Sequence, residues 1–491
     1  MSKKTYFIST SIPYVNAAPH IGHALEFVQA DILARYRRLK GDDVFFVSGT
    51  DDNALKNVQA AAEVNVPVQD FVNTNADIFK KLTKELNLSN NYFIRTSLDE
   101  KHIAGAQKIW KSFKPEDIYR KKYRGLYCLG CESFKTEKDL IDGKCPEHPN
   151  KKLEIVDEEN YFFKLSNYSE KLQKIIESNE IKIFPEGRKN EVLSFVRGGL
   201  EDLSISRSNE RARDWGIPVP GDPSQRQYVW VDALSNYINA LGYADGDEDF
   251  KRYWEDGDNI VHVIGKGISR FHAIYWPAFL LSAGIGLPKE IFVHGYFTTG
   301  GLKISKSLGN VIDPFEIIKN YGSESLRYFF ARHTHPFEDS DFTEERFKEA
   351  YNANLANGLG NLVSRVMKMA TANEIKFDDP GSKVKLATGQ EKFAETVRDY
   401  DRGFEEFNIQ KATDAIWDLI SKTDALIQKN QPFKKIKTDR EAGEEDIKEL
   451  LARLDFIATM LIPILPQTSS KILDLVYSSK MPDNPLFLRK E

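Results

Sequence analysis

Residues 19–23 read Pro19-His20-Ile21-Gly22-His23, and they stand where the chain first changes from a predicted strand to a predicted helix. The apolar run Tyr6-Phe7-Ile8-Ser9 before them predicts a buried strand, and the amphipathic stretch 24–40 after them predicts a helix. In doubly wound α/β folds such a turn binds phosphate groups, because backbone N–H groups and the helix dipole converge there. Two imidazoles in the turn favour phosphate chemistry over passive binding, and Gly22 would let a nucleotide approach the backbone closely.

Length and composition are those of a globular chain with several domains. With 491 residues it exceeds one ordinary domain, so we expect about two to four. A hydrophobic fraction of 41% is enough for real cores. The net charge of −5 does not itself indicate a nucleic-acid binder, although a basic face can be hidden in a near-neutral total. No apolar run reaches membrane-spanning length and no signal peptide precedes the first strand, so we expect a cytoplasmic protein.

A second apolar run, residues 43–49, ends in Thr50-Asp51-Asp52-Asn53. Polar residues at the C-terminal end of a parallel strand are well placed for ligand contacts. Asp51 is therefore a candidate for holding a cationic group. The alternative is that Asp51 caps a helix that begins near Ala54, and spacing alone does not decide between the two.

The three cysteines of the chain fall into one spaced pattern, Cys128-x2-Cys131 followed after thirteen residues by Cys145-x2-His148. This spacing places four ligands tetrahedrally around Zn²⁺ and leaves no open coordination position, which predicts a structural metal. The alternative is three unrelated buried thiols and a surface histidine. His148 is the ligand most easily replaced, by a water or a carboxylate.

A second α/β half follows, with strands predicted at residues 227–234, 259–265 and 291–295. It leads into a glycine-flanked loop, 300–309, that contains Lys303, Lys306 and two serines. Lysines on such a loop can neutralise a triphosphate in its transition state. Taken alone, the loop fits a solvated surface turn better than a phosphate loop. From about residue 346 helical periodicity dominates, which predicts a helical bundle with an exposed loop in the charged segment 434–449.

Two of these motifs, Pro19-His20-Ile21-Gly22-His23 and Lys303-Ile304-Ser305-Lys306-Ser307, resemble the two signatures of class I aminoacyl-tRNA synthetases. Within that class the chain resembles the methionyl-tRNA synthetase family along nearly its full length. The supporting stretches are 13–16 (Pro-Tyr-Val-Asn), the Cys-Cys-Cys-His insert, 215–220 (Trp-Gly-Ile-Pro-Val-Pro) and 228–234 (Tyr-Val-Trp-Val-Asp-Ala-Leu).

The resemblance implies an α/β fold in which a Rossmann-type catalytic domain is split by a zinc-bearing connective insertion and followed by an all-α anticodon-binding domain. The expected boundaries are 1–118 for the first catalytic half, 119–224 for the insertion, 225–295 for the second half, 296–345 for a stem-contact segment with the lysine loop, and 346–491 for the helical domain.

The resemblance also implies a ligase that joins methionine to tRNA(Met) with ATP. The methionine carboxylate would attack the α-phosphate to give methionyl-adenylate and pyrophosphate, and the terminal adenosine of the tRNA would then take the methionyl group. Such chemistry needs positioning and charge stabilisation, and it needs Mg²⁺ with the ATP. The catalytic residues implied are His20, His23, Lys303 and Lys306, and the ATP-binding residues are His20, Gly22, His23 and Lys306.

The resemblance further implies a methionine site of aromatic and aliphatic side chains, which suits a polarizable thioether. Its members would be Asp51 for the ammonium group and Ser11, Ile12, Tyr14, Trp230, Leu234, Tyr237, Ile268 and His272 around the side chain. From sequence alone, plain core packing is the favoured interpretation of Trp230 and Tyr237, and only the resemblance places them in the methionine site. In the helical domain, Asn361, Arg365 and Phe433 would read the anticodon.

The sequence departs from the family pattern at three places. Asp52-Asn53-Ala54 replaces an acidic-His-Gly run, Gly267 stands where an aspartate that places the ribose is common, and Phe433 stands where a stacking tryptophan is usual. A diverged class I paralogue with altered amino-acid or tRNA specificity is therefore the main alternative.

Two further alternatives are a synthetase for another amino acid and a zinc-dependent nucleic-acid-binding protein without catalysis. The insertion is too short for the editing domain of the Val, Ile and Leu enzymes. A pure binding protein would need neither the histidine turn nor the lysine loop. Because the sequence ends at Glu491 directly after the predicted bundle, we expect a monomer.

Overall fold

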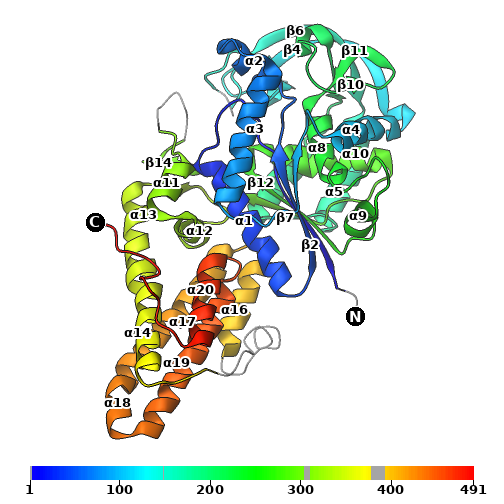
Figure 1. Cartoon of the computed structure of the whole chain (residues 1–491). Coiled ribbons are helices and arrows are strands. Elements are labelled where there is room, and N and C mark those ends of the chain that lie inside the picture. Colours follow the sequence, from blue (N-terminus) through cyan, green and yellow to red (C-terminus); the bar gives the residue numbers. More distant parts are fainter. Residues whose placement is uncertain (1–2, 136, 147–148, 304–309, 378–392) are drawn as a thin grey trace. The chain divides into compact units, whose positions relative to one another are not determined.

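The computed structural model describes residues 3–135, 137–146, 149–303, 310–377 and 393–491 (Figure 1). Two of the predicted site residues, His148 and Lys306, lie outside these ranges. The chain divides into two compact units. Unit 1 comprises Met1–Ala30, Asp43–Lys84 and Ser89–His294, and unit 2 comprises Asp31–Asp42, Glu85–Leu88 and Gly295–Glu491.

Unit 1 is built on a six-stranded parallel sheet with the strand order β3-β2-β1-β12-β13-β7. Its inner strands are almost wholly buried, because a parallel sheet is covered on both faces. This explains why they were predicted from continuous apolar runs. The strands are β1 (Thr5–Thr10), β2 (Asp43–Thr50), β3 (Tyr92–Arg95), β7 (Lys182–Phe184), β12 (Asn259–Gly265) and β13 (Glu290–His294).

The histidine turn joins β1 to helix α1 (Ile21–Leu39), as predicted for a strand–turn–helix unit. Helix α2 (Leu55–Glu63) follows β2, and its N-cap position is Ala54, which makes no side-chain capping bond. Asp51 therefore does not cap this helix. The further helices of unit 1 are α3 (Val68–Glu85), α4 (Glu100–Ser112), α5 (Ser169–Glu177), α6 (Glu186–Arg197), α7 (Asn209–Ala212), α8 (Val229–Asn239), α9 (Glu248–Phe250) and α10 (Trp276–Ala283).

The predicted insertion forms its own small sheets. One has four antiparallel strands in the order β5-β4-β6-β8, and another has three in the order β10-β11-β9. Strand β7, also from this stretch, lies at the edge of the central sheet beside β13. The strands of the small sheets are β4 (Ile118–Cys128), β5 (Ser133–Lys135), β6 (Glu154–Phe163), β8 (Leu203–Ser204), β9 (Ser206–Ser208), β10 (Pro218–Val219) and β11 (Asp222–Gln227).

One predicted strand is wrong. Residues 229–234 of the stretch 227–234 belong to helix α8 instead, whose eleven residues are all buried. A fully buried helix carries no polar face, so its sequence lacks the 3.6-residue period that distinguishes a helix from a buried strand. The short strand β3 was not predicted either.

Unit 2 contains a small three-stranded sheet, in the order β15-β14-β16, and a group of helices. In the charged segment 434–449, the predicted exposed loop is reduced to Asp439 between α18 and α19, because this residue accepts a hydrogen bond from Ala442 N–H and starts a new helix directly. The elements are β14 (Phe297–Thr299), β15 (Leu302–Lys303), β16 (Ser340–Asp341), α11 (Pro314–Tyr321), α12 (Ser323–Arg332), α13 (Glu344–Ala350), α14 (Asn361–Ala372), α16 (Ala394–Glu405), α17 (Ile409–Asn430), α18 (Pro432–Thr438), α19 (Arg440–Leu461) and α20 (Pro466–Ser478).

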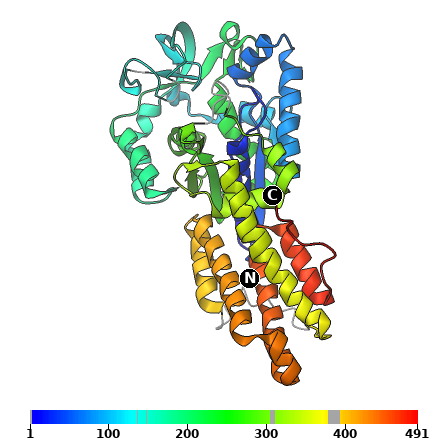
Figure 2. The same cartoon turned by 90° about the vertical axis from the view of Figure 1, so that its left-hand side faces the viewer.

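The helices of unit 2 that are coloured yellow to red run side by side in both views (Figures 1 and 2). A buried ion pair lies at the core of this unit, where Arg327 is 2.7 Å from Asp31 and neither side chain is exposed. Three further guanidinium N–H groups donate to backbone oxygens of Ile464, Pro463 and Leu86. Such extensive pairing is what allows a charge to be buried.

Candidate functional site

The two imidazoles of the histidine turn lie against each other, with ring centroids 3.9 Å apart. The Nδ1 atom of His20 accepts from Gly22 N–H at 3.0 Å, and the Nδ1 atom of His23 accepts from His20 N–H at 3.1 Å. In the neutral rings the proton is then on Nε2, which makes Nε2–H the donor. A methyl group on Gly22 would come within 2.9 Å of the His20 ring, so glycine is needed here for the histidine to pack.

Burial and the neighbouring His20 hold the pKa of His23 well below its ordinary value. His23 is therefore neutral near pH 7 and can donate a hydrogen bond without carrying a charge. Its ring contacts Phe79 of α3 edge-on at 5.1 Å. The turn thus offers fixed imidazole donors at the N-terminus of α1, as phosphate binding requires.

Asp51 is almost fully buried at the end of β2. Its Oδ1 atom accepts from Asn53 N–H at 3.1 Å, and its backbone oxygen accepts from the Asn57 side chain. Burial and the carboxylates of Asp232 and Glu132 raise its pKa well above the ordinary value. A buried carboxylate with this environment is stabilised by an incoming cation, which supports the ligand role over the capping role.

Four of the predicted pocket residues converge on one aromatic cluster. Tyr14 and Trp230 meet edge to face at 6.4 Å, and Trp230 and His272 at 6.3 Å. The hydroxyl of Tyr237 is 2.6 Å from Nε2 of His272, and Nδ1 of His272 is 3.0 Å from the carbonyl oxygen of Ile268. The carbonyl requires the ring proton on Nδ1, so the tyrosine donates to Nε2. Burial lowers the pKa of His272 to about 4, which keeps this pair neutral.

The remaining predicted pocket residues also lie in unit 1. Ile12 and Leu234 are buried in its core, with Ile268 packed against that core. Ser11 instead donates both its N–H and its hydroxyl to Glu26 on α1, at 2.7 and 2.5 Å. Phe271 also belongs to the aromatic cluster, because its ring stacks on Trp230 with the centroids 3.7 Å apart. It was not predicted, since an aromatic residue in an apolar segment indicates only core packing.

Two buried polar atoms in the aromatic cluster make no hydrogen bond to any other residue that the structure describes. They are the hydroxyl oxygen of Tyr14 and Nε1 of Trp230. Buried polar groups are rarely left unpaired, and such exceptions concentrate at sites that take a ligand or water. The cluster therefore has both the apolar surface and the unpaired polar atoms of a small-molecule site.

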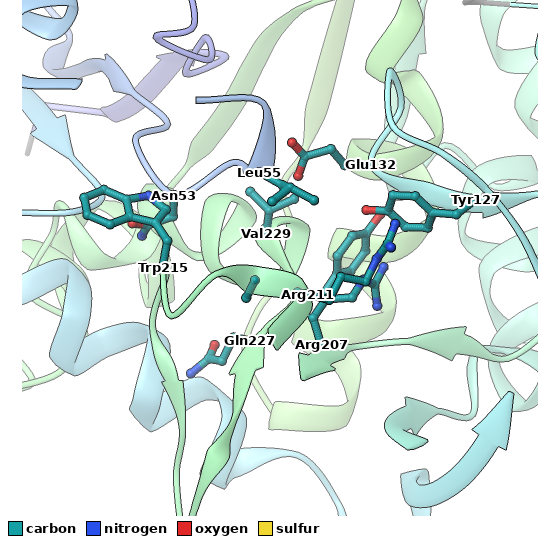
Figure 3. A pocket seen from close by; sticks show the side chains of 11 residues that line it. Asn53, Leu55, Tyr127, Glu132, Arg207, Arg211, Trp215, Gln227 and Val229 are labelled. Atoms are coloured by element: carbon teal, nitrogen blue, oxygen red, sulfur yellow. The ribbon is translucent and has the colours of Figure 1, made fainter. Parts of the chain in front are cut away.

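A small cavity of about 30 Å³ adjoins Asn53 and the insertion (Figure 3). Glu132 lies on one side, where its Oε1 accepts from Lys56 N–H at 2.9 Å. Arg207 and Arg211 stand beside the ring of Tyr127, with guanidinium carbons 5.3 and 4.4 Å from its centroid. The volume is enough for about two waters.

The three cysteine thiols lie together, with their Sγ atoms within 4.8 Å of one another. The Sγ atoms of Cys131 and Cys145 are 3.5 Å apart. Tetrahedral ligands about 2.3 Å from Zn²⁺ would be separated by about 3.8 Å, so the cluster fits a metal with little movement. The fourth predicted ligand, His148, lies outside the described residues. Three converging thiols favour a metal site over three unrelated buried cysteines.

The predicted phosphate-loop and anticodon residues belong to unit 2. The backbone of Lys303 ends strand β15, and Lys306 lies in the undescribed stretch 304–309, so the predicted roles of the two lysines in ATP binding and catalysis stay predictions. Asn361 is exposed in the first turn of α14, and Arg365 one turn later forms an ion pair with Asp424 of α17. Phe433 at the start of α18 is 42% exposed, which leaves its ring available for stacking.

Comparison with known proteins decides the family. The family model described as tRNA synthetases class I (M) matches residues 6–154 and 148–367, and the anticodon binding domain of methionyl tRNA ligase matches residues 383–484. The methionine–tRNA ligase of Brucella suis is 40% identical over 485 residues, which cover 97% of this chain and 92% of that protein. The chain belongs to the methionyl-tRNA synthetase family.

Other members of the methionyl-tRNA synthetase family agree with this assignment. The methionine–tRNA ligase of Thermotoga maritima is 39% identical, with 97% of this chain and 76% of that protein covered. The solved Mycobacterium tuberculosis methionyl-tRNA synthetase in complex with methionyl-adenylate superposes with a TM-score of 0.87 at 38% identity, over 96% of this chain and 94% of that one. The mixed α/β fold with a parallel sheet and a helical C-terminal part is thereby confirmed.

The structure shows the contacts of Asp52, the acidic residue that opens the stretch 52–54. Asp52 is fully buried, and its carboxylate accepts from Arg95, Ser97 and Thr50. It therefore serves the local fold rather than a ligand. Among the described residues, no helix combines the length and the apolar character needed to cross a membrane.

Proposed function

We propose that this chain is a methionine–tRNA ligase that works in two steps. In the first, a carboxylate oxygen of methionine attacks the α-phosphorus of ATP, the bond to the β-phosphate oxygen breaks, and pyrophosphate leaves. In the second, a ribose hydroxyl of the terminal tRNA adenosine attacks the carbonyl carbon of the adenylate, and AMP leaves. The observation that carries the proposal is the aromatic cluster of Tyr14, Trp230, Tyr237 and His272 in the same unit as Asp51 and the histidine turn.

The amino-acid end uses charge and polarizability. Asp51 holds the methionine ammonium by a charge-assisted hydrogen bond. The thioether packs against the rings of Trp230 and Tyr14, since sulfur interacts favourably with ring edges and faces. The neutral Tyr237–His272 pair adds polar atoms without charge, which suits a neutral side chain and excludes charged ones by the cost of burial.

The phosphate end uses donors and cations. His20 and His23 bind the phosphates through Nε2–H, Gly22 keeps the turn compact, and Mg²⁺ bound with ATP neutralises charge. Lys303 and Lys306 stabilise the departing pyrophosphate. This assignment rests on the resemblance of the two motifs and on the neutral, pre-oriented state of His23.

Two further groups of residues bind the tRNA and a structural metal. Asn361 and Arg365, one turn apart on α14, and the exposed ring of Phe433 read the single-stranded anticodon bases by hydrogen bonding and stacking. Cys128, Cys131, Cys145 and His148 hold one structural zinc. Zinc would supply only rigidity there, because four ligands leave no position for substrate.

Methionine-dependent exchange of pyrophosphate into ATP tests the activation step. We expect exchange with methionine and its loss in Trp230→Ala and Lys306→Ala, while Asp117→Asn, a change at a buried carboxylate that binds Tyr168 and Ser282, retains it. Exchange with a different amino acid would instead establish the diverged paralogue. Exchange with no amino acid would overturn the proposal and favour a nucleic-acid-binding protein.

A further inference from the structure

A buried polar chain beside Asp51 takes no part in the proposed reaction. Its centre is Asp232 on α8, which is 1% exposed and uses both carboxylate oxygens. Oδ1 is 2.5 Å from Nε2 of His102 on α4, and Oδ2 accepts from Nδ2 of Asn53 at 2.7 Å. These three residues come from three elements that lie far apart in the sequence: the loop after β2, α4 and α8.

The direction of each hydrogen bond in this chain is fixed. The Asp232 carboxylate can only accept, so Nε2 of His102 carries a proton and donates it to Asp232, and Nδ2 of Asn239 lies 3.2 Å from Nδ1 on the other side of the ring. Nδ2 of Asn53 also donates to the carbonyl oxygen of Thr96 at 3.2 Å, which fixes the orientation of the amide. His102 is itself placed by Asp99, which caps α4.

Close packing of α4 against α8 keeps this arrangement rigid. A methyl group on Gly105 of α4 would come within 1.9 Å of the Asn239 side chain, so only glycine lets the two helices approach this closely. His102 and Asn239 are wholly buried in this contact, and Asp232 is nearly so. Both carboxylate oxygens of Asp232 and both ring nitrogens of His102 have partners here, so a shift of the helices would leave a buried polar group without its partner.

These hydrogen-bonded side chains connect the two ends of the proposed amino-acid site. At one end, Asn53 donates its backbone N–H to Oδ1 of Asp51 at 3.1 Å. At the other end, Asp232 lies on the same helix as Trp230, Leu234 and Tyr237. The carboxylate that takes the ammonium and the wall that takes the side chain are therefore connected through Asn53 and Asp232.

We propose that His102, Asp232 and Asn53 form a brace that sets the spacing between the Asp51 carboxylate and the aromatic wall on α8. These three are positioning residues for the amino-acid substrate, since none of them is assigned a contact with it. The brace rests on the proposed function, and it adds determinants of methionine affinity that lie outside the ligand's own contacts. If these residues only stabilised the fold, their substitution would lower the stability of the protein without changing the KM for methionine more than the KM for ATP.

An exchange of the two facing groups tests the brace. Asn53→Asp alone places two carboxylates face to face, and we expect the KM for methionine to rise about tenfold or more while the KM for ATP changes less than about twofold. Asp232→Asn alone places two amides face to face and should act in the same direction. The double variant Asn53→Asp/Asp232→Asn restores one amide and one carboxylate, and His102 still has an acceptor, so most of the loss should be recovered.

Thermal unfolding and a matched control separate positioning from stability. Asp117→Asn removes a buried carboxylate elsewhere in unit 1 and should lower the unfolding temperature with both KM values unchanged. The brace is refuted if the folded single variants keep the wild-type KM for methionine. It is also refuted if both KM values rise together, or if the double variant is no better than the sum of its parts.

The wild-type protein distinguishes failure of the brace from failure of the proposed function. Exchange by the wild type with methionine establishes the function before any variant is compared. Calorimetric titration of wild type and variants with methionine alone gives the same ranking without the chemical step, and a loss of affinity in Asn53→Asp that the double variant reverses supports the brace independently of turnover.

Discussion

At the scale of single residues, the sequence could nominate the candidate site but not its internal contacts. Asp51, Trp230, Tyr237 and His272 were named from motif positions, and the structure brings the three aromatic residues into one cluster in unit 1, which also holds Asp51. Phe271 and His102 could not be named in this way. His102 meets Asp232 only because the fold brings together residues 130 positions apart, and a lone histidine on the buried face of an amphipathic helix gives no functional signal.

The Asp51 carboxylate should dominate affinity for the amino acid. Asp51→Asn keeps the shape and the Asn53 contact but removes the charge, and a hydrogen bond between charged groups is worth about 1.5–3 kcal/mol. We expect kcat/KM for methionine in pyrophosphate exchange to fall by roughly ten- to hundredfold. An unchanged kcat/KM in the folded variant would mean that another group binds the ammonium.

Methionine binding should weaken as the pH falls through the raised pKa of Asp51. The ionised form binds the ammonium, and burial holds the pKa of this group well above 3.8, so affinity is present above the raised pKa and lost below it. Calorimetric titration with methionine across pH checks this. Affinity that stays constant until the ordinary carboxyl range would contradict the assignment of Asp51.

At the scale of elements, strands with one apolar run and helices with one apolar face were predictable, and fully buried elements were not. Strand β12 was predicted at its observed bounds, 259–265, whereas α8 was predicted as a strand because all its faces are buried. The segment 434–449 was predicted to include an exposed loop, yet the Asp439 cap and buried residues such as Ile447 make it helical apart from Asp439 itself. Local charge is a poor guide where a bundle buries one stripe of a helix.

Helix α2 should depend for its N-terminal cap on the cysteine module, the segment 128–148 that contains the three cysteines. Its own N-cap residue, Ala54, offers no acceptor, and Glu132, next to Cys131, accepts from Lys56 N–H instead. Glu132→Ala should lower the free energy of unfolding by about 1 kcal/mol, measured by urea denaturation. Glu170→Ala in the exposed first turn of α5 is the control and should stay within about 0.5 kcal/mol. Equal effects would mean that Glu132 provides no cap.

The cysteine module should contain one metal ion. Elemental analysis of the freshly purified protein should find about one zinc per chain, and Cys145→Ala should lose it and unfold at a lower temperature, because metal binding contributes to folding free energy. Protein without metal that unfolds at the same temperature after chelation would refute the zinc assignment.

At the scale of the whole molecule, the two units should have separable roles. Unit 1 contains the amino-acid cluster and the histidine turn, and unit 2 contains Arg365 and Phe433. The order of motifs along the chain predicted an α/β part followed by a helical part, but the contacts that build each unit could not be predicted. The buried Arg327–Asp31 pair, for example, joins residues almost 300 positions apart.

Changes in the anticodon-reading residues should therefore affect tRNA charging alone. Phe433→Ala removes a stacking surface worth about 1–3 kcal/mol per base and should lower kcat/KM for tRNA(Met) by roughly ten- to hundredfold. Methionine-dependent pyrophosphate exchange should stay at the wild-type rate. Tyr477→Ala, at another exposed ring of unit 2, is the control. Equal loss of charging and exchange in Phe433→Ala would contradict a separate anticodon site.

The proposed activity of the protein is to activate methionine and transfer it to tRNA(Met). The most direct measurement offers the protein ATP, Mg²⁺, total tRNA and all twenty amino acids at equal concentration, and identifies the amino acid and the tRNA of every ester formed by mass spectrometry. We predict methionyl esters of tRNA(Met) and no others. Esters of a different amino acid, or methionyl esters of a different tRNA, would contradict the claim.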